Sequence, residues 1–595
     1  MKILGITIGQ CSGSSLFVND KIIFSSSEER YSRKKSDESY PIHSINDGLK
    51  QCEINPNDLD KVVIAGTNIS LVPIILRIYS SFSVEDNLRS MKEYWHPLLV
   101  NNKSVNMLEL FKDKISKEQY PFTSPIFSEF ELSKLFYPPN PENEKKVADM
   151  LKKAISEHLK IDQSIIENTD HHTCHAAYAF YGSPIRDDNT IIITADAWGD
   201  DLSGSISVYD REHNKINRLK EYDHKSFQLA RIYRYVTLYL RMQPNEHEYK
   251  VMGLASYYDG EKIREVEKVF ESMQTLDNLD FKFNSQIKDI YNYLEENLQN
   301  FRFDHIAAGI QSFTEKLMTN WVKNILKFYD SDTLVFSGGL SMNVKANMKI
   351  SHLDELTKFF VCGGGGDESI AMGACYSYAE SKNCDIVPLE NLYLGSDLHY
   401  NESDLTPDSK SFNISKYENP KQIVDKLLDG KIIATCFGRA EMGPRSLGNR
   451  SIIADPRKIS NVEKINHKIK NRDFWMPFAP VVLYDFQDKI IQNPKNLDSP
   501  FMTIGFDTIN GKELMPAAVH RSDGTARPEI LKKETNPQLW NVIKEFYDET
   551  GIPALLNTSF NLHGEPLVNS LTDAFHVFEN SGLDTLWLSN HIVDK

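Results

Sequence analysis

Three histidines lie close together in residues 170–179, which read DHHTCHAAYA. If this stretch is helical, His171 and His175 are four residues apart and share one face. Two imidazoles at this spacing can bind one metal ion. The same spacing is common where histidine only caps or packs a helix, so the pair alone leaves both interpretations open.

A second candidate group follows a run of glycines. Gly363–Gly366 come directly before Asp367 and before residues 370–380, which we expect to be helical. Glycines let the backbone approach a ligand closely. Asp367 is therefore either a ligand or an N-cap, and capping is the more common use of an isolated acid at this position.

Basic residues stand among glycines, hydroxyls and amides in the last 200 residues. Guanidinium groups bind phosphate and carboxylate with paired hydrogen bonds, and hydroxyls and amides complete such sites. We therefore predict an anion pocket there. The segments that form it are 438–450 (GRAEMGPRSLGNR), 468–472 (KIKNR), 520–527 (HRSDGTAR) and 557–561 (NTSFN).

Two strand–turn–strand patterns are expected to position these groups. The first 25 residues form one, with a polar turn at Gln10–Ser15, and residues 191–209 form the other, with a turn that begins near Asp196. Such turns expose backbone N–H groups and can bind phosphate. Because the pattern occurs twice, we predict a duplicated domain with a cleft between its halves.

The composition limits the classes of protein. The chain has 595 residues, 41% of them hydrophobic, and a net charge of −16, which indicates a globular protein of more than one domain and argues against nucleic acid as a partner. Seven cysteines without a CxxC pair indicate a reducing compartment, the cytoplasm. We find no signal peptide and no apolar run of about 18 residues, so we expect no membrane association.

The domain organisation follows from changes in pattern. We predict an N-terminal domain, 1–385, a linker, 386–400, rich in proline and polar residues, and a C-terminal domain, 401–595. Residues 73 to about 150 are expected to form a helical insertion with loops.

Taken together, the motifs resemble the O-carbamoyltransferases of the nodulation-factor, cephamycin and tobramycin type. They follow the family order from the first strand to about residue 590, and the combination is specific although each motif alone is weak. The matching motifs include EERYSRKK from Glu28, HHTCHAAYAF from His171, NEHEYKVMGLASY from Asn245, SGGLSMNVKAN from Ser337, GGGGDESIAMGAC from Gly363, GRAEMGPRSLGNRSIIADPR from Gly438 and NTSFNLHGEPLV from Asn557.

The resemblance implies a fold and a reaction. It implies an α/β N-terminal domain of the duplicated actin-like ATPase fold and an α+β C-terminal domain of the YrdC-like fold. In such enzymes the C-terminal domain makes carbamoyl-adenylate and pyrophosphate from carbamoyl phosphate and ATP, supplied with Mg²⁺. The N-terminal domain then transfers the carbamoyl group to a hydroxyl of a small specialised metabolite. We expect the 73–150 insertion to set acceptor specificity, and a homodimer by the base rate for soluble enzymes.

The resemblance also assigns residues. His171, His175 and Asp367 match the family's metal ligands, whereas His172 has a weaker claim. The family metal is iron, Fe(II), and chemistry alone leaves Zn²⁺ or Mn²⁺ open. Residues matched to the transfer step are Lys35, Asn343 and Gln10. Residues matched to nucleotide and carbamoyl phosphate binding are Gly338, Gly339, Asp196, Arg439, Arg445, Arg450, Lys470, Arg472, Arg527, Asn557, Thr558 and Ser559.

Two positions depart from the family pattern. Gln10-Cys11 stands where members commonly have His-Asp, and Met476 stands where they often have arginine. If that histidine deprotonates the acceptor, Gln10 cannot do so at pH 7, and another base must serve. The departures support an alternative, a nucleotide-binding homologue with impaired transfer. The shared folds also allow threonylcarbamoyl transfer to tRNA, against which the acidic charge argues.

Overall fold

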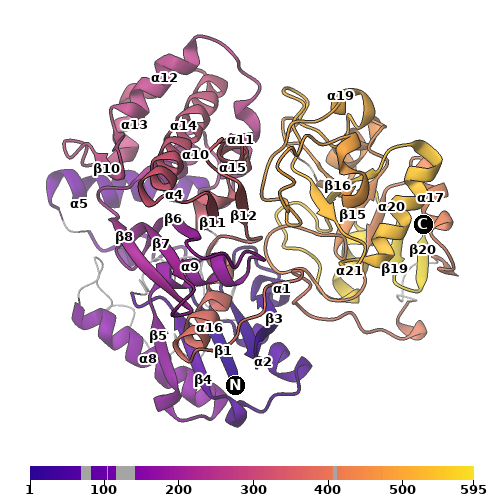
Figure 1. The fold of residues 1–595 in the computed structure, drawn as a ribbon, viewed down its shortest axis with the longest axis horizontal. Helices are drawn as coiled ribbons and strands as arrows, with labels where there is room; N and C mark the ends of the chain where they lie inside the picture. Colours follow the sequence, from indigo (N-terminus) through magenta and orange to yellow (C-terminus); the bar gives the residue numbers. More distant parts are fainter. Residues whose placement is uncertain (69–81, 104, 116–140, 406–411, 471) are drawn as a thin grey trace. The chain divides into compact units, whose positions relative to one another are not determined.

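The chain folds into two compact units in a computed structural model (Figure 1). The structure describes all residues except 69–81, 104, 116–140, 406–411 and 471. The first unit consists of Met1–Glu28, Ser36–Phe359 and Gly365–Pro388, and the second consists of Glu29–Lys35, Phe360–Gly364 and Leu389–Lys595. Two short segments within the range predicted for the N-terminal domain, 1–385, therefore belong to the second unit.

The first sheet of the first unit has the strand order β3-β2-β1-β4-β5. The first three strands form an antiparallel meander, and β1, β4 and β5 run parallel. The central strand β1 is almost wholly buried, as its continuous apolar sequence predicts. The strands are β1 (Lys2–Thr7), β2 (Gly13–Val18), β3 (Lys21–Ser27), β4 (Lys61–Ala65) and β5 (Ile166–Thr169).

The second sheet repeats this order as β8-β7-β6-β11-β12. Its first three strands again form an antiparallel meander, and β11 runs parallel to β6. The duplication predicted from the two strand–turn–strand patterns is thus confirmed. The strands are β6 (Ile191–Gly199), β7 (Leu202–Asp210), β8 (Lys215–Asp223), β11 (Thr333–Ser337) and β12 (Lys358–Val361).

Two helices join the sheets. Helix α16 (Ile370–Ser381) packs on the first sheet, helix α9 (His171–Tyr181) packs on the second, and the two helices pack on each other (Figure 1). Their backbones nearly touch, because a Cβ added to Gly373 would lie 1.9 Å from the carbonyl oxygen of Cys174. Glycine is therefore required at 373 for α9 and α16 to approach this closely.

The remaining elements of the first unit are mainly helical. The predicted insertion is helical where it is described, and its residues 73–81, 104 and 116–140 lie outside the described residues. The helices are α2 (Ile42–Gln51), α4 (Val84–Ser90), α5 (His96–Asn101), α6 (Met107–Leu110), α8 (Pro141–Leu159), α10 (Leu229–Tyr239), α11 (Glu248–Ala255), α12 (Lys262–Glu271), α13 (Ile290–Leu298), α14 (Phe303–Tyr329) and α15 (Val344–Ser351), with a hairpin of β9 (Gln274–Asp277) and β10 (Asp280–Phe283).

The second unit is built on one mixed sheet with the order β13-β20-β19-β14-β15-β18-β16-β17. The main helices are α17 (Lys421–Leu428), α18 (Ser460–Ile465), α20 (Pro537–Thr550) and α21 (Leu571–Glu579), and Glu29–Ser32 form the short helix α1. The strands are β13 (Asn413–Lys416), β14 (Ile433–Thr435), β15 (Ser451–Ala454), β16 (Ala479–Leu483), β17 (Glu529–Leu531), β18 (Ala554–Ser559), β19 (Thr585–Leu588) and β20 (His591–Asp594).

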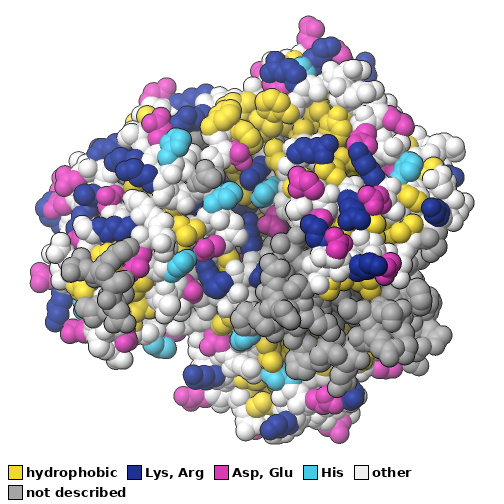
Figure 2. All heavy atoms as spheres, turned by 180° about the vertical axis from the view of Figure 1, so that it is seen from behind, with side chains coloured by type: hydrophobic (Ala, Val, Ile, Leu, Met, Phe, Trp, Pro, Cys, Tyr) yellow, Lys and Arg dark blue, Asp and Glu magenta, His cyan; other side chains and the backbone are white. Residues whose placement is uncertain are grey.

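The surface carries both basic and acidic side chains, as the composition indicates. Basic and acidic side chains are interspersed on the face shown in Figure 2. Among the described helices we find none with the length and apolar character needed to span a bilayer. The seven cysteines are free thiols.

Candidate metal centre

Four side chains meet at one point of the first unit. They are His171 and His175 of α9, Asp196 of β6 and Asp367, which directly precedes α16, and their ligand atoms all lie within 4.8 Å of one another. The Oδ1 atom of Asp367 is 3.6 Å from Nε2 of each histidine, and Oδ2 of Asp196 is 3.3 Å from Nε2 of His175. The structure thus brings together the three ligands predicted from sequence and adds Asp196.

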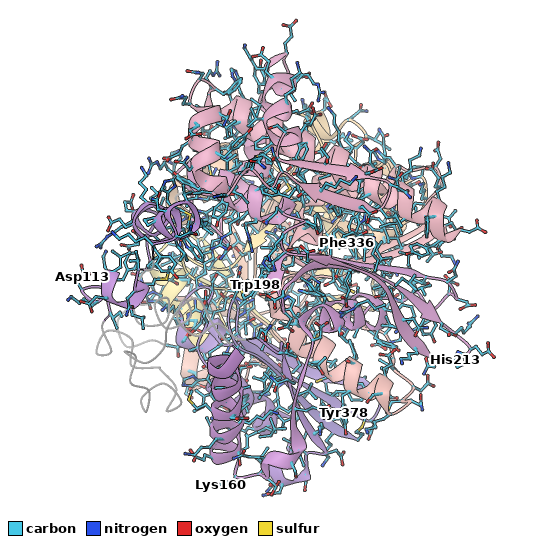
Figure 3. All side chains as sticks on the ribbon, turned by 90° about the vertical axis from the view of Figure 1, so that its left-hand side faces the viewer. Asp113, Lys160, Trp198, His213, Phe336 and Tyr378 are labelled. Carbon is cyan, nitrogen blue, oxygen red and sulfur yellow. The ribbon has the colours of Figure 1, made fainter. Side chains whose placement is uncertain are left out.

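Local structure fixes both histidines at the start of α9. Asp170 caps the helix, since its Oδ1 accepts a 2.7 Å hydrogen bond from the N–H of Thr173. Gly199 ends β6 against the first imidazole, where a Cβ would lie only 2.2 Å from the His171 ring. Trp198 of β6 and Phe336 of β11, which are labelled in Figure 3, lie on the two neighbouring strands of this sheet.

The donor atoms fit a metal ion. The Nε2 atoms of His171 and His175 are buried and have no hydrogen-bond partner among the residues that the structure describes. The Nδ1 atom of His175 is 3.1 Å from Oγ of Ser337, and this contact orients the ring so that Nε2 faces the carboxylates. Buried imidazole nitrogens without partners beside two carboxylates are the arrangement that a divalent cation satisfies.

The electrostatics couple these groups strongly. Burial lowers the pKa of His175, but Asp196 and Asp367 outweigh it and raise this pKa to about 9. Burial raises the pKa of Asp196, but His175 and His171 hold it well below its usual range. A cation bound here would replace the proton on His175 and complete the neutralisation of both carboxylates.

His172 is not one of the four clustered ligands. Its Nδ1 lies 2.8 Å from Oγ1 of Thr194, and the side chain is fully buried. Burial, together with His171 and His175, lowers the pKa of His172 to about 3. This histidine therefore remains neutral inside the core.

The predicted nucleotide-contacting turn is next to the cluster. The N–H of Gly339 donates to Oδ2 of Asp196 at 3.1 Å, and the N–H of Gly338 donates to the carbonyl of Gly365 at 2.8 Å. Gly338 has φ +97° and a Cβ there would lie 2.4 Å from the Ala195 carbonyl, so only glycine fits. Asp196 was predicted to contact nucleotide, and its position among the histidines is the feature that sequence reasoning missed. The only signal was an acid at the end of a buried strand.

Asn343 and Gln10 both make hydrogen bonds within the first unit. Asn343 caps α15, with its Oδ1 accepting the N–H of Ala346 at 3.0 Å. The Gln10 amide donates to the carbonyl of Asn245 at 3.3 Å, and the N–H of Asn245 donates to Oε1 of Glu248 at 2.7 Å.

Glu248, which sequence reasoning did not select, is a further ionisable group linked to Gln10. Burial raises the pKa of Glu248 to about 7, although the Asn245 N–H and Arg234 oppose the shift. A carboxylate with such a pKa exists in both protonation states near neutral pH.

The predicted anion-binding arginines belong to the second unit, and two of them hold the backbone. Arg450 is fully buried and donates to the carbonyls of Phe437 at 2.7 Å and Gly438 at 3.0 Å. Arg439 donates through Nε to the carbonyl of Gly395 at 3.0 Å. These contacts give Arg439 and Arg450 a role in shaping the 438–450 loop.

Glu441 completes this loop. Its Oε1 accepts three backbone N–H groups, from Leu447 at 2.8 Å, Asn449 at 2.9 Å and Arg450 at 3.0 Å. The loop that carries Arg445 is therefore held on its N–H side by a buried carboxylate and on its carbonyl side by a buried guanidinium.

The other predicted residues surround β18. Lys470 is 4% exposed, and its Nζ donates to Oγ of Ser559 at 3.1 Å and to the carbonyl of Asn561 at 2.9 Å. Asn557 donates to the carbonyl of Ser446 at 3.2 Å, which ties this strand to the arginine loop.

Three of the residues predicted to bind anions remain to be placed in the second unit. Thr558 is on β18, the Arg472 guanidinium lies 5.3 Å from the centre of the Phe478 ring, and Arg527 follows Ala526, which pairs with Phe506. Met476 is buried, so it belongs to the core and supplies no anion contact at the position where the family often has arginine.

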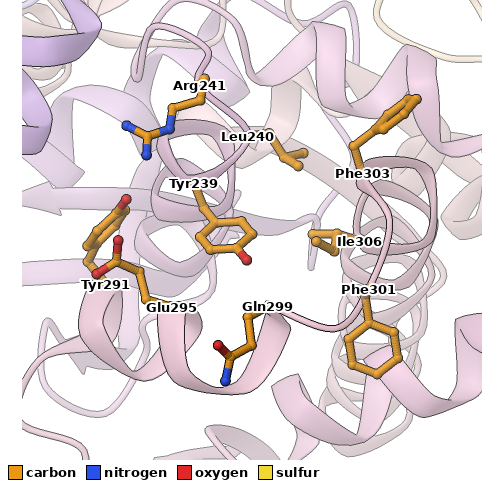
Figure 4. A pocket seen from close by; sticks show the side chains of 9 residues that line it. All are labelled: Tyr239, Leu240, Arg241, Tyr291, Glu295, Gln299, Phe301, Phe303 and Ile306. Carbon is orange, nitrogen blue, oxygen red and sulfur yellow. The ribbon is translucent and has the colours of Figure 1, made fainter.

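A separate pocket of about 580 Å³ lies in the first unit (Figure 4). It contains none of the predicted site residues and none of the four clustered ligands. It is lined by Tyr239, Leu240, Arg241, Tyr291, Glu295, Gln299, Phe301, Phe303 and Ile306.

Known proteins match the chain over its whole length. A family model described as carbamoyltransferase N-terminus matches residues 2–376, and one described as carbamoyltransferase C-terminus matches residues 424–595. An uncharacterized protein of Methanocaldococcus jannaschii is 29% identical over 607 residues, which cover 100% of this chain and 99% of that one.

Two named relatives match over shorter stretches. Nodulation protein NolO of Bradyrhizobium diazoefficiens is 31% identical over 72% of this chain and 79% of its own length. The 3'-hydroxymethylcephem-O-carbamoyltransferase of Amycolatopsis lactamdurans is 26% identical over 47% of this chain and 52% of its own.

Proposed function

The chain belongs to the carbamoyltransferase family, and we propose that it transfers a carbamoyl group from carbamoyl phosphate, through carbamoyl-adenylate, to a hydroxyl of a small metabolite. The observation that carries this proposal is the buried cluster of two histidines and two carboxylates in the part of the chain that matches the N-terminal family model. We further propose that the first unit has the actin-like ATPase fold, which the repeated sheet order supports, and that the second has the YrdC-like fold.

We assign adenylate formation to the second unit. Water releases inorganic phosphate from carbamoyl phosphate and leaves carbamate, whose oxygen attacks the α-phosphorus of ATP, and pyrophosphate departs. The products are then carbamoyl-adenylate, pyrophosphate and inorganic phosphate, which balances the phosphorus. Arg445, Lys470 and Arg472 would bind these anions on the loops held by Glu441 and Arg450.

We assign transfer to the first unit. The acceptor hydroxyl attacks the carbamoyl carbon, AMP leaves, and the hydroxyl proton passes to a base. His171, His175 and Asp367 would hold a divalent cation, with Asp196 as a fourth ligand or as an acceptor for the Gly339 N–H. When bound, such a cation, which we propose to be Fe(II), supplies Lewis-acid polarisation of the carbamoyl group. The Gly338–Gly339 turn would contact the nucleotide.

Glu248 is our candidate for the base that replaces the missing histidine. It is linked through Asn245 to Gln10, the position at which the family commonly has histidine. A pKa of about 7 is suited to proton transfer at neutral pH. The amide of Gln10 cannot accept a proton there, but it can position an acceptor group by hydrogen bonding.

Two assays test the proposal separately. Pyrophosphate release that requires both ATP and carbamoyl phosphate tests adenylate formation, and mass spectrometry for a carbamoyl gain on candidate hydroxyl metabolites tests transfer. Pyrophosphate release without transfer to any acceptor would favour a homologue with impaired transfer. If the chain releases no pyrophosphate from the two substrates, the assignment of the second unit is wrong.

A further inference from the structure

The charged run at residues 28–35, EERYSRKK, is divided between the two units. Glu28 belongs to the first unit, where it accepts the N–H of Ser44 at 2.9 Å. From Glu29 to Lys35 the chain belongs to the second unit, and it returns to the first at Ser36. Such a run usually covers a solvated face, but Arg30 is only 3% exposed.

Arg30 holds the turn of the arginine loop. Its Nη2 donates to the carbonyl of Gly443 at 2.6 Å. Gly443 has φ +90°, and a Cβ there would lie 3.2 Å from Cα of Gly364, so this turn is tightly confined. A buried guanidinium is costly unless it is hydrogen-bonded. The Arg30 bond therefore fixes the backbone two residues before Arg445.

Arg33 holds a different loop, the one that follows β18. Its Nη1 donates to the carbonyl of Leu567 at 2.6 Å and its Nη2 to that of Pro566 at 2.9 Å. Its guanidinium also lies 3.5 Å from the carboxylate of Asp573. Four protein contacts on one partly exposed side chain, including a 3.7 Å ion pair with Glu565, tie the segment to this loop.

The loop held by Arg33 closes on Lys470. Asn561 donates from Nδ2 to the carbonyl of Glu565 at 2.5 Å, and its own carbonyl accepts the Lys470 ammonium at 2.9 Å. Burial, Arg472 and Lys35 together hold the pKa of Lys470 well below its usual range. Lys35 therefore adds positive charge at this point, and an anion bound here would relieve the repulsion among the three cationic groups.

We propose that Glu29–Lys35 is an integral part of the anion site of the second unit, in which Arg30 and Arg33 are positioning residues for its two loops. The inference rests on the proposed function, because the anions concerned are carbamoyl phosphate and ATP. It explains why a charged segment that closely follows β3 in the sequence belongs to the second unit. The C-terminal half of the sequence is then incomplete as an adenylate-forming site without this segment.

The test uses the full-length chain with Arg30→Met, Arg30→Lys and Arg33→Ala. We expect kcat/KM of pyrophosphate release for carbamoyl phosphate to fall at least tenfold in Arg30→Met and about threefold in Arg33→Ala, with partial recovery in Arg30→Lys. Hydrogen exchange should quicken in residues 438–450 for the Arg30 variants and in residues 561–568 for Arg33→Ala. Metal content and the unfolding of the first unit should stay at the wild-type values, because the hydrogen bonds of Arg30 and Arg33 are to the second unit. Lys421→Ala is the matched control, because its exposed pairs with Asp425 and Glu549 lie on the surface of the same unit.

Each outcome decides the inference. Wild-type kcat/KM in both Arg30→Met and Arg33→Ala would overturn it and leave the proposed function standing. A wild-type chain without pyrophosphate release would overturn the proposed function and this inference with it. Joint loss of metal and of thermal stability in the variants would show a general structural role and refute positioning.

Discussion

The metal cluster of the first unit and the arginine loop of the second use buried polar groups in opposite ways. In the cluster, the Nε2 atoms of two histidines are buried, have no hydrogen-bond partner in the described part of the chain, and face two carboxylates. In the loop, the buried side chains of Arg450 and Glu441 are bonded to backbone groups of their own segment. Buried atoms without partners that converge beside two carboxylates point to a ligand. Arg450 and Glu441 leave only Nε and Oε2 without a partner among the described residues, and their other polar atoms bond the backbone, which points to a framework.

The difference also lies in the chain separation. The cluster ligands come from α9, β6 and the turn that leads into α16. The two ligands that lie farthest apart in the sequence are His171 and Asp367. The loop is a contiguous motif, residues 438–450, held by hydrogen bonds within the motif and by distant contacts such as those of Arg30 to Gly443 and Asn557 to Ser446. A dispersed site depends on helix packing, and a contiguous one depends on local hydrogen bonds.

The largest effect that separates the two regions is expected from His175→Ala. Removing one of two imidazoles should lower the bound metal per chain to below about a tenth of the wild-type value, because even a change to an outer partner of a ligand costs about 10–100-fold in metal affinity. Elemental analysis of the purified protein measures it. His172→Gln is the control and should keep the metal, since His172 contacts Thr194 and not the cluster. Equal metal content in His175→Ala and wild type would refute the assignment.

Gly373→Val should act on the same site through packing. The added side chain meets the carbonyl of Cys174, a backbone atom that cannot move aside. We expect a loss of about 3 kcal/mol or more in the free energy of unfolding, at the upper end of overpacking effects, together with loss of metal. Chemical denaturation measures the first. Ser381→Val, at the exposed end of α16, should change stability by about 0.5 kcal/mol or less. A Gly373→Val chain as stable as wild type would contradict the close helix contact.

Arg450→Met tests the framework interpretation of the loop. It removes the donors to the carbonyls of Phe437 and Gly438, and each unsatisfied buried group costs roughly 1–3 kcal/mol. We expect the second unit to unfold at lower denaturant while metal binding in the first is unchanged. Arg450→Met that weakens ATP binding without any change in stability would instead make Arg450 a direct anion ligand.

Glu248→Gln gives the smallest effect, and it depends on pH. The folded-state pKa of about 7 lies above the ordinary glutamate pKa of 4.5, so the folded chain binds more protons between these two values. Wild-type stability relative to the variant should therefore fall as pH rises from about 4.5 to 7, by at most about 1.4 kcal/mol per pH unit. Below pH 4.5 the difference should be constant. Denaturant titrations of both proteins at pH 5 and 7.5 measure it, and parallel curves would show that Glu248 is not perturbed.

The sequence predicted much of the first unit correctly. The duplicated sheet followed from two strand–turn–strand patterns, because apolar alternation and polar turns are local properties. The pairing of His171 with His175 followed from helix periodicity. The proximity of Asp367 came only from the resemblance, since no local pattern links it to α9.

The sequence did not predict which charged side chains bond the backbone and which remain available to bind a ligand. Arg450 and Arg445 stand in one motif and cannot be told apart by residue type, yet Arg450 is fully buried and bonded to carbonyls. Asp196 was expected to contact nucleotide and lies among the histidines. The segment Glu29–Lys35 was assigned to the N-terminal domain, because chain order gives no hint that the segment packs elsewhere.

By itself, the sequence determined which residues could do chemistry, the spacing of the two histidines, and the repeated strand pattern that frames them. Only the tertiary structure decided which of these groups meet, because that depends on Gly373 letting α9 and α16 touch and on which backbone groups each charged side chain satisfies. Local spacing is set by covalent geometry, whereas contacts between distant segments are set by packing and by the cost of leaving buried polar atoms unpaired.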